Sequence, residues 1–482
     1  MTEGSLISPM TNGGAAGQNI RPRMHGVSVA LHWLILAGTY GFLILKAFLV
    51  FRPTYDFVWY HLPHALRLFH LTTFTYQPSL ILRMKYFPPL AHLVQGFSVW
   101  VTGRMSAANG VGMVGLMAAV LAMFLIFRNE KMVRWFLTFC LAVPLIVLHM
   151  TIGYIDLFTG CMLLIGFVGF LGMTLRLRLR LSGFIFVAGL TAAMFSKALA
   201  WMPAIIFGLF GFVQIVRLVR SHDITARLGW ALGLTLLIGI GAFPTSNFLR
   251  YGSTNPDSYV PFTRLVLTRP SDPILNTPAL PPIVRGRMPP IPFLLSAFEI
   301  NRLFSDEPYH WSFDENFRPG SQHERMGGWF FVTVCIATVL LLIGFGKKII
   351  PRFPLAAFFC AIAGISTILL YLELRYALFI PLIAAFLLSA FWDGYPRIIR
   401  LTAQTALILC ALYVASQLPA DFWSMDTRPP EAFAPPEARA FWIQHQNEKL
   451  TEPIPIKRAG SMSIFWSGPT FSEIPVIVTD EE

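Results

Sequence analysis

The sequence predicts an all-α polytopic membrane protein, on the evidence of its composition and of the long apolar runs that recur along it. Of its 482 residues, 55% are hydrophobic and 13% are charged, whereas a typical soluble domain is about 25% charged. A helix of about 20 apolar residues crosses the hydrocarbon core, and the runs here are continuous, unlike the alternating segments of an outer-membrane barrel. Helices satisfy their own backbone hydrogen bonds in lipid, so membrane-spanning helices are expected.

Lysine and arginine residues in short loops set the expected orientation, because such clusters stay on the cytoplasmic side. They occur around Arg21, Lys131, Arg178, Arg220, Lys348 and Arg397. With these clusters inside, about eleven spans follow, near 27–50, 107–127, 133–153, 157–175, 182–197, 200–218, 229–248, 328–346, 353–371, 376–392 and 401–418. The same clusters account for the formal charge of +12 without a nucleic-acid partner.

This layout predicts a multi-pass protein of the cytoplasmic (inner) membrane, with a cytoplasmic N-terminal tail at 1–26 and a membrane module at 27–418. Two large loops, 51–106 and 249–327, and the C-terminal tail 419–482 fall on the extracytoplasmic side. The tail is either a small domain or a segment that packs on the loops. The apolar stretch 182–218 is too long for one helix, so we expect a tight hairpin at Lys197–Trp201.

Two aspartates stand out because carboxylates are scarce in the first half of the chain. Asp56 and Asp156 each follow the outer end of a predicted span and have aromatic neighbours. An ionisable group at the membrane boundary is incompletely solvated, which makes it a candidate for function. The alternatives are a helix N-cap for Asp56 and a turn former for Asp156.

Three motifs on the same predicted face carry a family resemblance. They are Asp56-x-x-x-Tyr60-His61-Leu62-Pro63, Tyr86-x-Pro88-Pro89-Leu90, and Glu373-Leu374-Arg375-Tyr376 followed by Pro381. In this order they resemble the membrane glycosyltransferases of the GT-C fold, and in particular the bacterial branch related to protein mannosyltransferases and aminoarabinose transferases (glycosyltransferase family 39-like). The resemblance covers roughly 27–400 and does not reach the tail.

The resemblance implies a GT-C-like bundle with interfacial helices in the first extracytoplasmic loop. It also implies an inverting transfer of a sugar from a polyprenyl-phosphate or polyprenyl-diphosphate donor to a glycan, lipid or protein acceptor. Asp56 would be the general base. Phosphate would be bound by basic residues on the outer face, where the positive-inside rule makes such residues uncommon. The candidates are Lys85, Arg375, Arg52 and Lys197. Tyr60, His61 and Glu373 would complete the substrate-binding set.

The chain departs from the family pattern at one point, and some of these assignments have simpler alternatives. Many members of the family place two adjacent acidic residues in the first loop, whereas Phe57 follows Asp56 here. Asp156 is therefore the candidate for the second carboxylate, and a divalent cation stays open as a cofactor. Arg52 could instead snorkel at the end of its span, and Lys85 could be a solvated loop residue. Zinc ligation by His61 and its neighbours is disfavoured, because no loop cysteine is available.

Two other classes of function compete with the transferase. A lipid-linked glycan ligase or polymerase would use the long loop 249–327, which holds several arginines. A transporter or flippase would show related halves and charges near the midplane. The early position of Asp56 and the clustering of candidate charges at one face favour the transferase.

Overall fold

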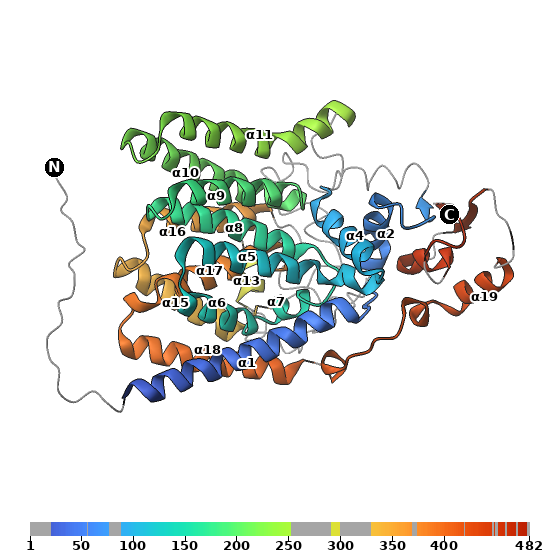
Figure 1. Ribbon diagram of the computed structural model, residues 1–482, viewed down its shortest axis with the longest axis horizontal. Helices are drawn as coiled ribbons and strands as arrows, with labels where there is room; N and C mark the ends of the chain where they lie inside the picture. Colours follow the sequence, from blue (N-terminus) through green and yellow to red (C-terminus); the bar gives the residue numbers. More distant parts are fainter. Residues whose placement is uncertain are drawn as a thin grey trace. The chain divides into compact units, whose positions relative to one another are not determined.

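The computed structural model is mostly helical (Figure 1). It describes residues 21–54, 56–76, 88–251, 291–298, 329–368, 374–418, 420–445, 448, 452–457, 460–468 and 471–479. The chain divides into two units, Met1–Phe42 and Leu43–Glu482. The described part of the first unit consists of the beginning of helix α1 (Arg21–Leu49), and every site discussed below lies in the second unit.

Within the described part of the chain, five helical stretches are long and apolar enough to cross a membrane. They are Ser28–Leu49, Met105–Phe127, Asp156–Thr174, Ala198–Arg220 and Arg397–Gln417. Shorter apolar helices lie at Leu179–Met194, Ala226–Ala242, Phe331–Gly346, Arg352–Ser366 and Leu374–Ala390. These helices support a membrane-embedded, largely helical protein. The number of eleven spans and their orientation stay predictions.

Helix α8 (Asp156–Thr174) is the central helix of the bundle (Figure 1), and all but two of its 19 residues are buried. Its neighbours are α5 (Val111–Phe127), α9 (Leu179–Met194), α10 (Trp201–Arg220), α16 (Arg352–Ile368) and α17 (Phe379–Ala390). A Cβ atom at Gly189 of α9 would lie 2.3 Å from the backbone nitrogen of Gly166 in α8. Small residues let helix backbones approach this closely, which is how apolar helices pack where water supplies no driving force.

The hairpin predicted within 182–218 is confirmed. Helix α9 ends at Met194, a single 3₁₀ turn η3 covers Ala198–Ala200, and α10 begins at Trp201. Lys197 has an extended backbone, with φ −159° and ψ 138°, and forms the break.

The predicted span 133–153 is wrong in detail, because two helices replace it. Helix α6 (Glu130–Leu141) is capped by Asn129, whose side chain accepts a hydrogen bond from the Met132 backbone N–H. Val143 is extended, and α7 (Pro144–His149) starts a new helix. Proline has no N–H to donate and disfavours the helical conformation of the residue before it, so Pro144 interrupts the run.

The other described helices complete the bundle. They are α11 (Ala226–Tyr251), α13 (Ile291–Ala297), α15 (Phe331–Gly346) and α18 (Arg397–Gln417), with 3₁₀ turns η6 (Leu374–Ala377) and η7 (Trp392–Gly394). Most of the loop 249–327 lies outside the described residues, and so do its acidic residues.

The first loop, 51–106, folds around a π-helical turn. This turn, η1 (Phe57–His61), runs into α2 (Leu62–Leu68), and the Leu62 N–H donates to the Phe57 carbonyl oxygen. Strand β1 (Thr75–Tyr76), α4 (Leu90–Thr102) and the 3₁₀ turn η2 (Met105–Gly110) follow. Isolated π-helical turns occur frequently at functional sites.

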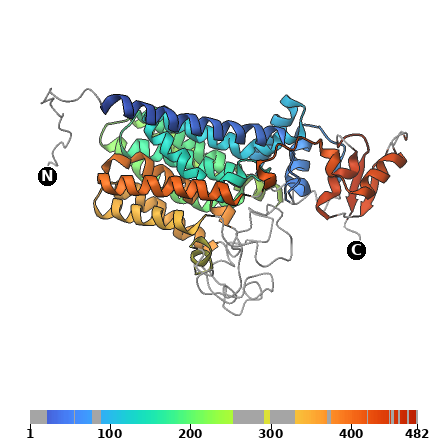
Figure 2. The same ribbon diagram turned by 90° about the horizontal axis from the view of Figure 1, so that it is seen from below.

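The tail packs on the first loop and contains strands, which departs from the all-helical prediction (Figures 1 and 2). Its elements are η8 (Ala420–Trp423), η9 (Pro430–Phe433), α19 (Pro436–His445), β2 (Ile454–Lys457), η10 (Gly460–Ser467) and β3 (Val476–Thr479). The strands form a parallel sheet in the order β1-β3-β2, in which Thr75 pairs with Ile477. Phe57 of the loop and Phe465 of the tail belong to one hydrophobic core.

Candidate functional site

Asp56 and Asp156 each lie at the start of a helical segment. Asp56 immediately precedes η1 and makes no capping hydrogen bond with its side chain. The simple N-cap alternative for Asp56 therefore has no support. Asp156 is the first residue of α8, and its side chain is directed to a partner outside that helix.

Each aspartate forms an ion pair with one of the predicted basic residues. An Arg375 guanidinium nitrogen lies 2.8 Å from Oδ2 of Asp56, and the two side chains are 10% and 17% exposed. Lys197 Nζ lies 2.5 Å from Oδ1 of Asp156, with the two side chains 18% and 1% exposed. The helix break at Lys197 and the turn η6 at Arg375 therefore bring both cations to the predicted carboxylates.

Two tyrosines join these ion pairs into one group. Lys197 Nζ lies 4.2 Å from the centre of the Tyr376 ring, and Arg375 donates a 3.0 Å hydrogen bond to the Tyr376 hydroxyl. The Arg375 guanidinium also lies over the Tyr154 ring, at 4.8 Å. Cations are attracted to the faces of aromatic rings, so the rings help to hold the charges in place. We call Asp56, Asp156, Lys197 and Arg375 the charged cluster.

Tyr60 and His61 lie at the end of η1. Burial and the nearby Asp56 carboxylate raise the pKa of Tyr60 well above its usual value, so its hydroxyl stays protonated and can donate a hydrogen bond. The Tyr60 and His61 rings are 4.1 Å apart. His61 Nδ1 lies 2.9 Å from Nε2 of His92, the third residue of α4. Burial lowers the pKa of both histidines, which keeps both rings neutral near pH 7.

Gly153 fixes the position of the turn that follows Asp56. The Phe57 ring packs directly on Gly153, where an added Cβ would lie 1.9 Å from a ring carbon. The Gly153 carbonyl in turn accepts a 2.7 Å hydrogen bond from the buried Gln95 side chain. The glycine is thus held from one side while Phe57 covers the other.

An apolar groove opens beside the break at Lys197. It has a volume of about 490 Å³ and is lined by α4, α9 and α11 together with Pro89 and Phe195. Phe195 is two residues before Lys197, and its carbonyl oxygen accepts a 2.8 Å hydrogen bond from the Leu90 N–H. Pro89 and Leu90 of the Pro-Pro-Leu motif therefore form part of the wall of this groove.

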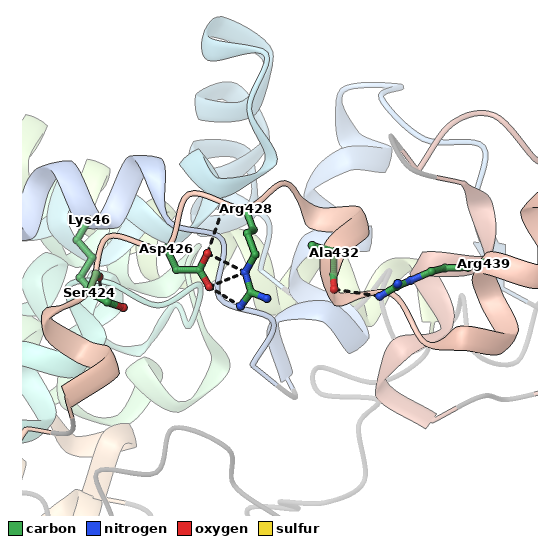
Figure 3. A network of polar contacts seen from close by, with 6 residues as sticks. All are labelled: Lys46, Ser424, Asp426, Arg428, Ala432 and Arg439. Atoms are coloured by element: carbon green, nitrogen blue, oxygen red, sulfur yellow. Dashed lines mark hydrogen bonds and ion pairs between the residues drawn. The ribbon is translucent and has the colours of Figure 1, made fainter.

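Arg52, a predicted phosphate ligand, belongs to a different group of contacts. Its guanidinium lies 5.4 Å from the centre of the Phe422 ring in the tail, and Lys46 Nζ lies 5.2 Å from the same ring. Lys46 donates a 2.7 Å hydrogen bond to the Ser424 carbonyl, next to the Asp426–Arg428 ion pair (Figure 3). These contacts give Arg52 a place in anchoring the tail. Lys85 and Glu373 lie outside the described residues.

Sequence reasoning assigned no role to three neighbours of the charged cluster. Tyr154 and Tyr376 stand beside Asp156 and Arg375 in the sequence, so their proximity could have suggested a role. His149 is buried, and its ring lies 5.5 Å from that of Tyr154. Its Nδ1 atom has no hydrogen-bond partner among the described residues. A single histidine in an apolar run gave no signal to distinguish it from a core residue.

We expect the buried histidines to make the folded protein sensitive to acid. Burial and Arg67 lower the pKa of His64 to about 4, and His61 and His92 shift in the same direction. Above about pH 6.5 the rings are neutral both folded and unfolded; below it the unfolded chain binds protons that the folded protein excludes. Stability from these groups is therefore lost as the pH falls from about 6.5 toward 4.

We therefore expect the thermal unfolding midpoint in detergent to decrease as the pH is lowered from about 7 to about 5. The variant His64→Gln should show a smaller decrease over the same pH range. Unfolding scans at several pH values would measure it. His70→Asn is the matched control, because His70 is exposed and asparagine tolerates its positive φ of 55°. Identical pH profiles for wild type and His64→Gln would contradict the assignment.

The comparisons with known proteins gave no match. Neither a protein-family model, nor a curated protein, nor a solved structure matches this chain. The charged cluster and its surroundings are therefore the features that bear on function.

Proposed function

We propose that the protein is an inverting membrane glycosyltransferase that uses a polyprenyl-phosphate or polyprenyl-diphosphate sugar donor. The observation that carries this proposal is the charged cluster. Two carboxylates and two cations, drawn from four distant parts of the chain, meet at the ends of helical segments. An apolar groove that suits a lipid chain is lined in part by Phe195, two residues before Lys197 of the cluster.

The chemistry of transfer needs the groups that the cluster contains. An acceptor hydroxyl or amine attacks the anomeric carbon, a new bond to that carbon forms, and the bond to the phosphate oxygen breaks. The lipid phosphate leaves with the electron pair, so positive charge near the departing oxygens lowers the barrier. Lys197 and Arg375 supply that charge, since each already lies against a carboxylate of the cluster.

Asp56 is the proposed general base. Its side chain is only 17% exposed and one oxygen is paired with Arg375, which orients the carboxylate. Attack from the side opposite the leaving phosphate inverts the anomeric centre. Asp156, which is more deeply buried and paired with Lys197, is suited to holding that lysine in position. The acceptor is a glycan, a lipid or a protein, and the proposed location is the extracytoplasmic face of the inner membrane.

Replacing Asp56 by asparagine tests the proposal. The substitution keeps the size of the side chain and removes its ability to accept a proton, so transfer should fall by roughly 10²–10⁴-fold. The measurement is transfer of labelled sugar from lipid-linked donors of the host membrane to host glycans, with donor binding followed in parallel.

The matched control is Asp393→Asn, which removes a surface carboxylate paired with Lys131 and Arg400. That variant should transfer sugar at the wild-type rate. If Asp56→Asn also does so, Asp56 is not the base and the transferase assignment loses its main support.

A further inference from the structure

Three histidines of the first loop lie together beside the charged cluster. His61 ends the π-helical turn, His64 is one turn further in α2, and His92 is in the first turn of α4. The His61 and His92 rings are stacked 5.1 Å apart and joined by the 2.9 Å contact of their nitrogens. His64 stands edge-on to His92, with ring centres 4.7 Å apart.

The close approach of α4 to α2 brings these rings together. A Cβ at Gly96 would lie 2.6 Å from the Ala65 carbonyl oxygen, so only glycine allows the helices to approach this closely. His92 is four residues before Gly96 and therefore lies on the same face of α4. Its ring is thereby placed against His61 and His64, which come from successive turns.

Burial decreases along the series. His61 and His92 are buried, while His64 is partly exposed. The His64 Nε2 atom is itself covered and has no hydrogen-bond partner among the described residues. The three rings thus run from the neighbourhood of Lys197 and Arg375 to a partly exposed residue of α2.

The cations that face these rings disfavour a full positive charge on them, so the rings are neutral between transfers. Lys197 and Arg375 disfavour positive charge on His61, and Arg67 is the charged neighbour of His64. Tyr60 and Tyr154 contact His61 through their rings. A neutral imidazole has one N–H donor and one acceptor nitrogen, so it can take up a proton on one side and release another from the other side.

We infer that His61, His92 and His64 form a proton relay that empties the general base after each transfer. The inference rests on the proposed function, in which Asp56 receives the proton of the acceptor and must lose it again. The π-helical turn spaces Asp56 and His61 by five residues, close to one turn of such a helix.

The proton passes from the Asp56 carboxyl group to His61 Nε2, and the Nδ1 proton of His61 passes to His92 Nε2. His92 then gives a proton to His64, which releases it to water. No electron is transferred, and each imidazole returns to its neutral form.

The test is His92→Gln, measured in the full-length protein. A glutamine side chain can retain a hydrogen bond to His61 but cannot exchange one proton for another. We expect the maximal rate of transfer to fall roughly 10-fold or more, with the donor KM unchanged and the solvent deuterium isotope effect increased. Added imidazole should restore much of the rate, because a small base can replace the missing ring.

His70→Asn, the exposed histidine control, should show neither the loss nor the rescue. A wild-type rate in His92→Gln, or a loss that imidazole does not restore, would overturn the relay while leaving the transferase intact. Absence of transfer in every preparation, wild type included, would overturn the proposed function and the role of the relay with it.

Discussion

Lys197→Met should destabilise the protein by about 3–5 kcal/mol, the usual cost of removing one partner of a buried ion pair. The Asp156 side chain is 1% exposed, and Lys197 lies 2.5 Å from it. Without the lysine, the aspartate must stay charged in a site that excludes water or take up a proton there. Denaturation in mixed micelles, followed by tryptophan fluorescence, would measure the change in unfolding free energy.

Two controls separate this effect from the loss of a lysine as such. Lys131→Met breaks an ion pair whose side chains are 39% and 64% exposed, so it should cost no more than about 1 kcal/mol. The double variant Asp156→Asn with Lys197→Met removes both charges and should recover much of the lost stability. Equal losses of unfolding free energy in Lys197→Met and Lys131→Met would show that the buried ion pair stabilises the protein no more than the exposed one.

Gly153→Ala should lower both stability and transfer. The added methyl group would lie 1.9 Å from the Phe57 ring, which is fully buried. Overpacking of this kind costs about 1–3 kcal/mol. Because Phe57 follows Asp56 directly, its displacement also moves the proposed base, and a shift of about 1 Å can lower the rate 10²-fold.

The control for this prediction is Gly241→Ala in α11, where an added Cβ meets nothing within 4 Å. That variant should be neutral or slightly stabilising, since alanine favours helices more than glycine does. Phe57→Leu combined with Gly153→Ala should recover part of the stability, because the smaller side chain leaves room for the methyl group. Wild-type transfer by Gly153→Ala would show that the contact does not position Asp56.

The members of the charged cluster could be selected from the sequence, but their pairing could not. Asp56 and Asp156 were identifiable because carboxylates are scarce and these two adjoin aromatic residues at span ends. Lys197 and Arg375 were identifiable because basic residues are unusual on the predicted outer side. Which cation meets which carboxylate depends on the packing of α8, α10 and η6, and no local pattern encodes it.

The tail and the break before Pro144 show where sequence reasoning failed. Apolar composition predicted one span at 133–153, although the proline already marked an interruption. Strand β1 contains two residues, too few for an alternating pattern to be recognised. Its partner β3 is far along the chain, and hydrophobic periodicity carries no information about such distant pairs. The contact of Arg52 with Phe422 is equally distant in the sequence, so it could not be foreseen either.

The pairing of β1 with β3 has a consequence for biosynthesis. Thr75 and Val476, which are hydrogen-bonded, are separated by 401 residues. At typical translation speeds of about 5–20 residues per second, the partner strand emerges roughly 20–80 s after β1. During that interval the apolar side of the first loop is uncovered and open to chaperones and proteases. A stop codon before Val476 would therefore leave every residue of the charged cluster in the chain, yet expose the nascent protein to degradation.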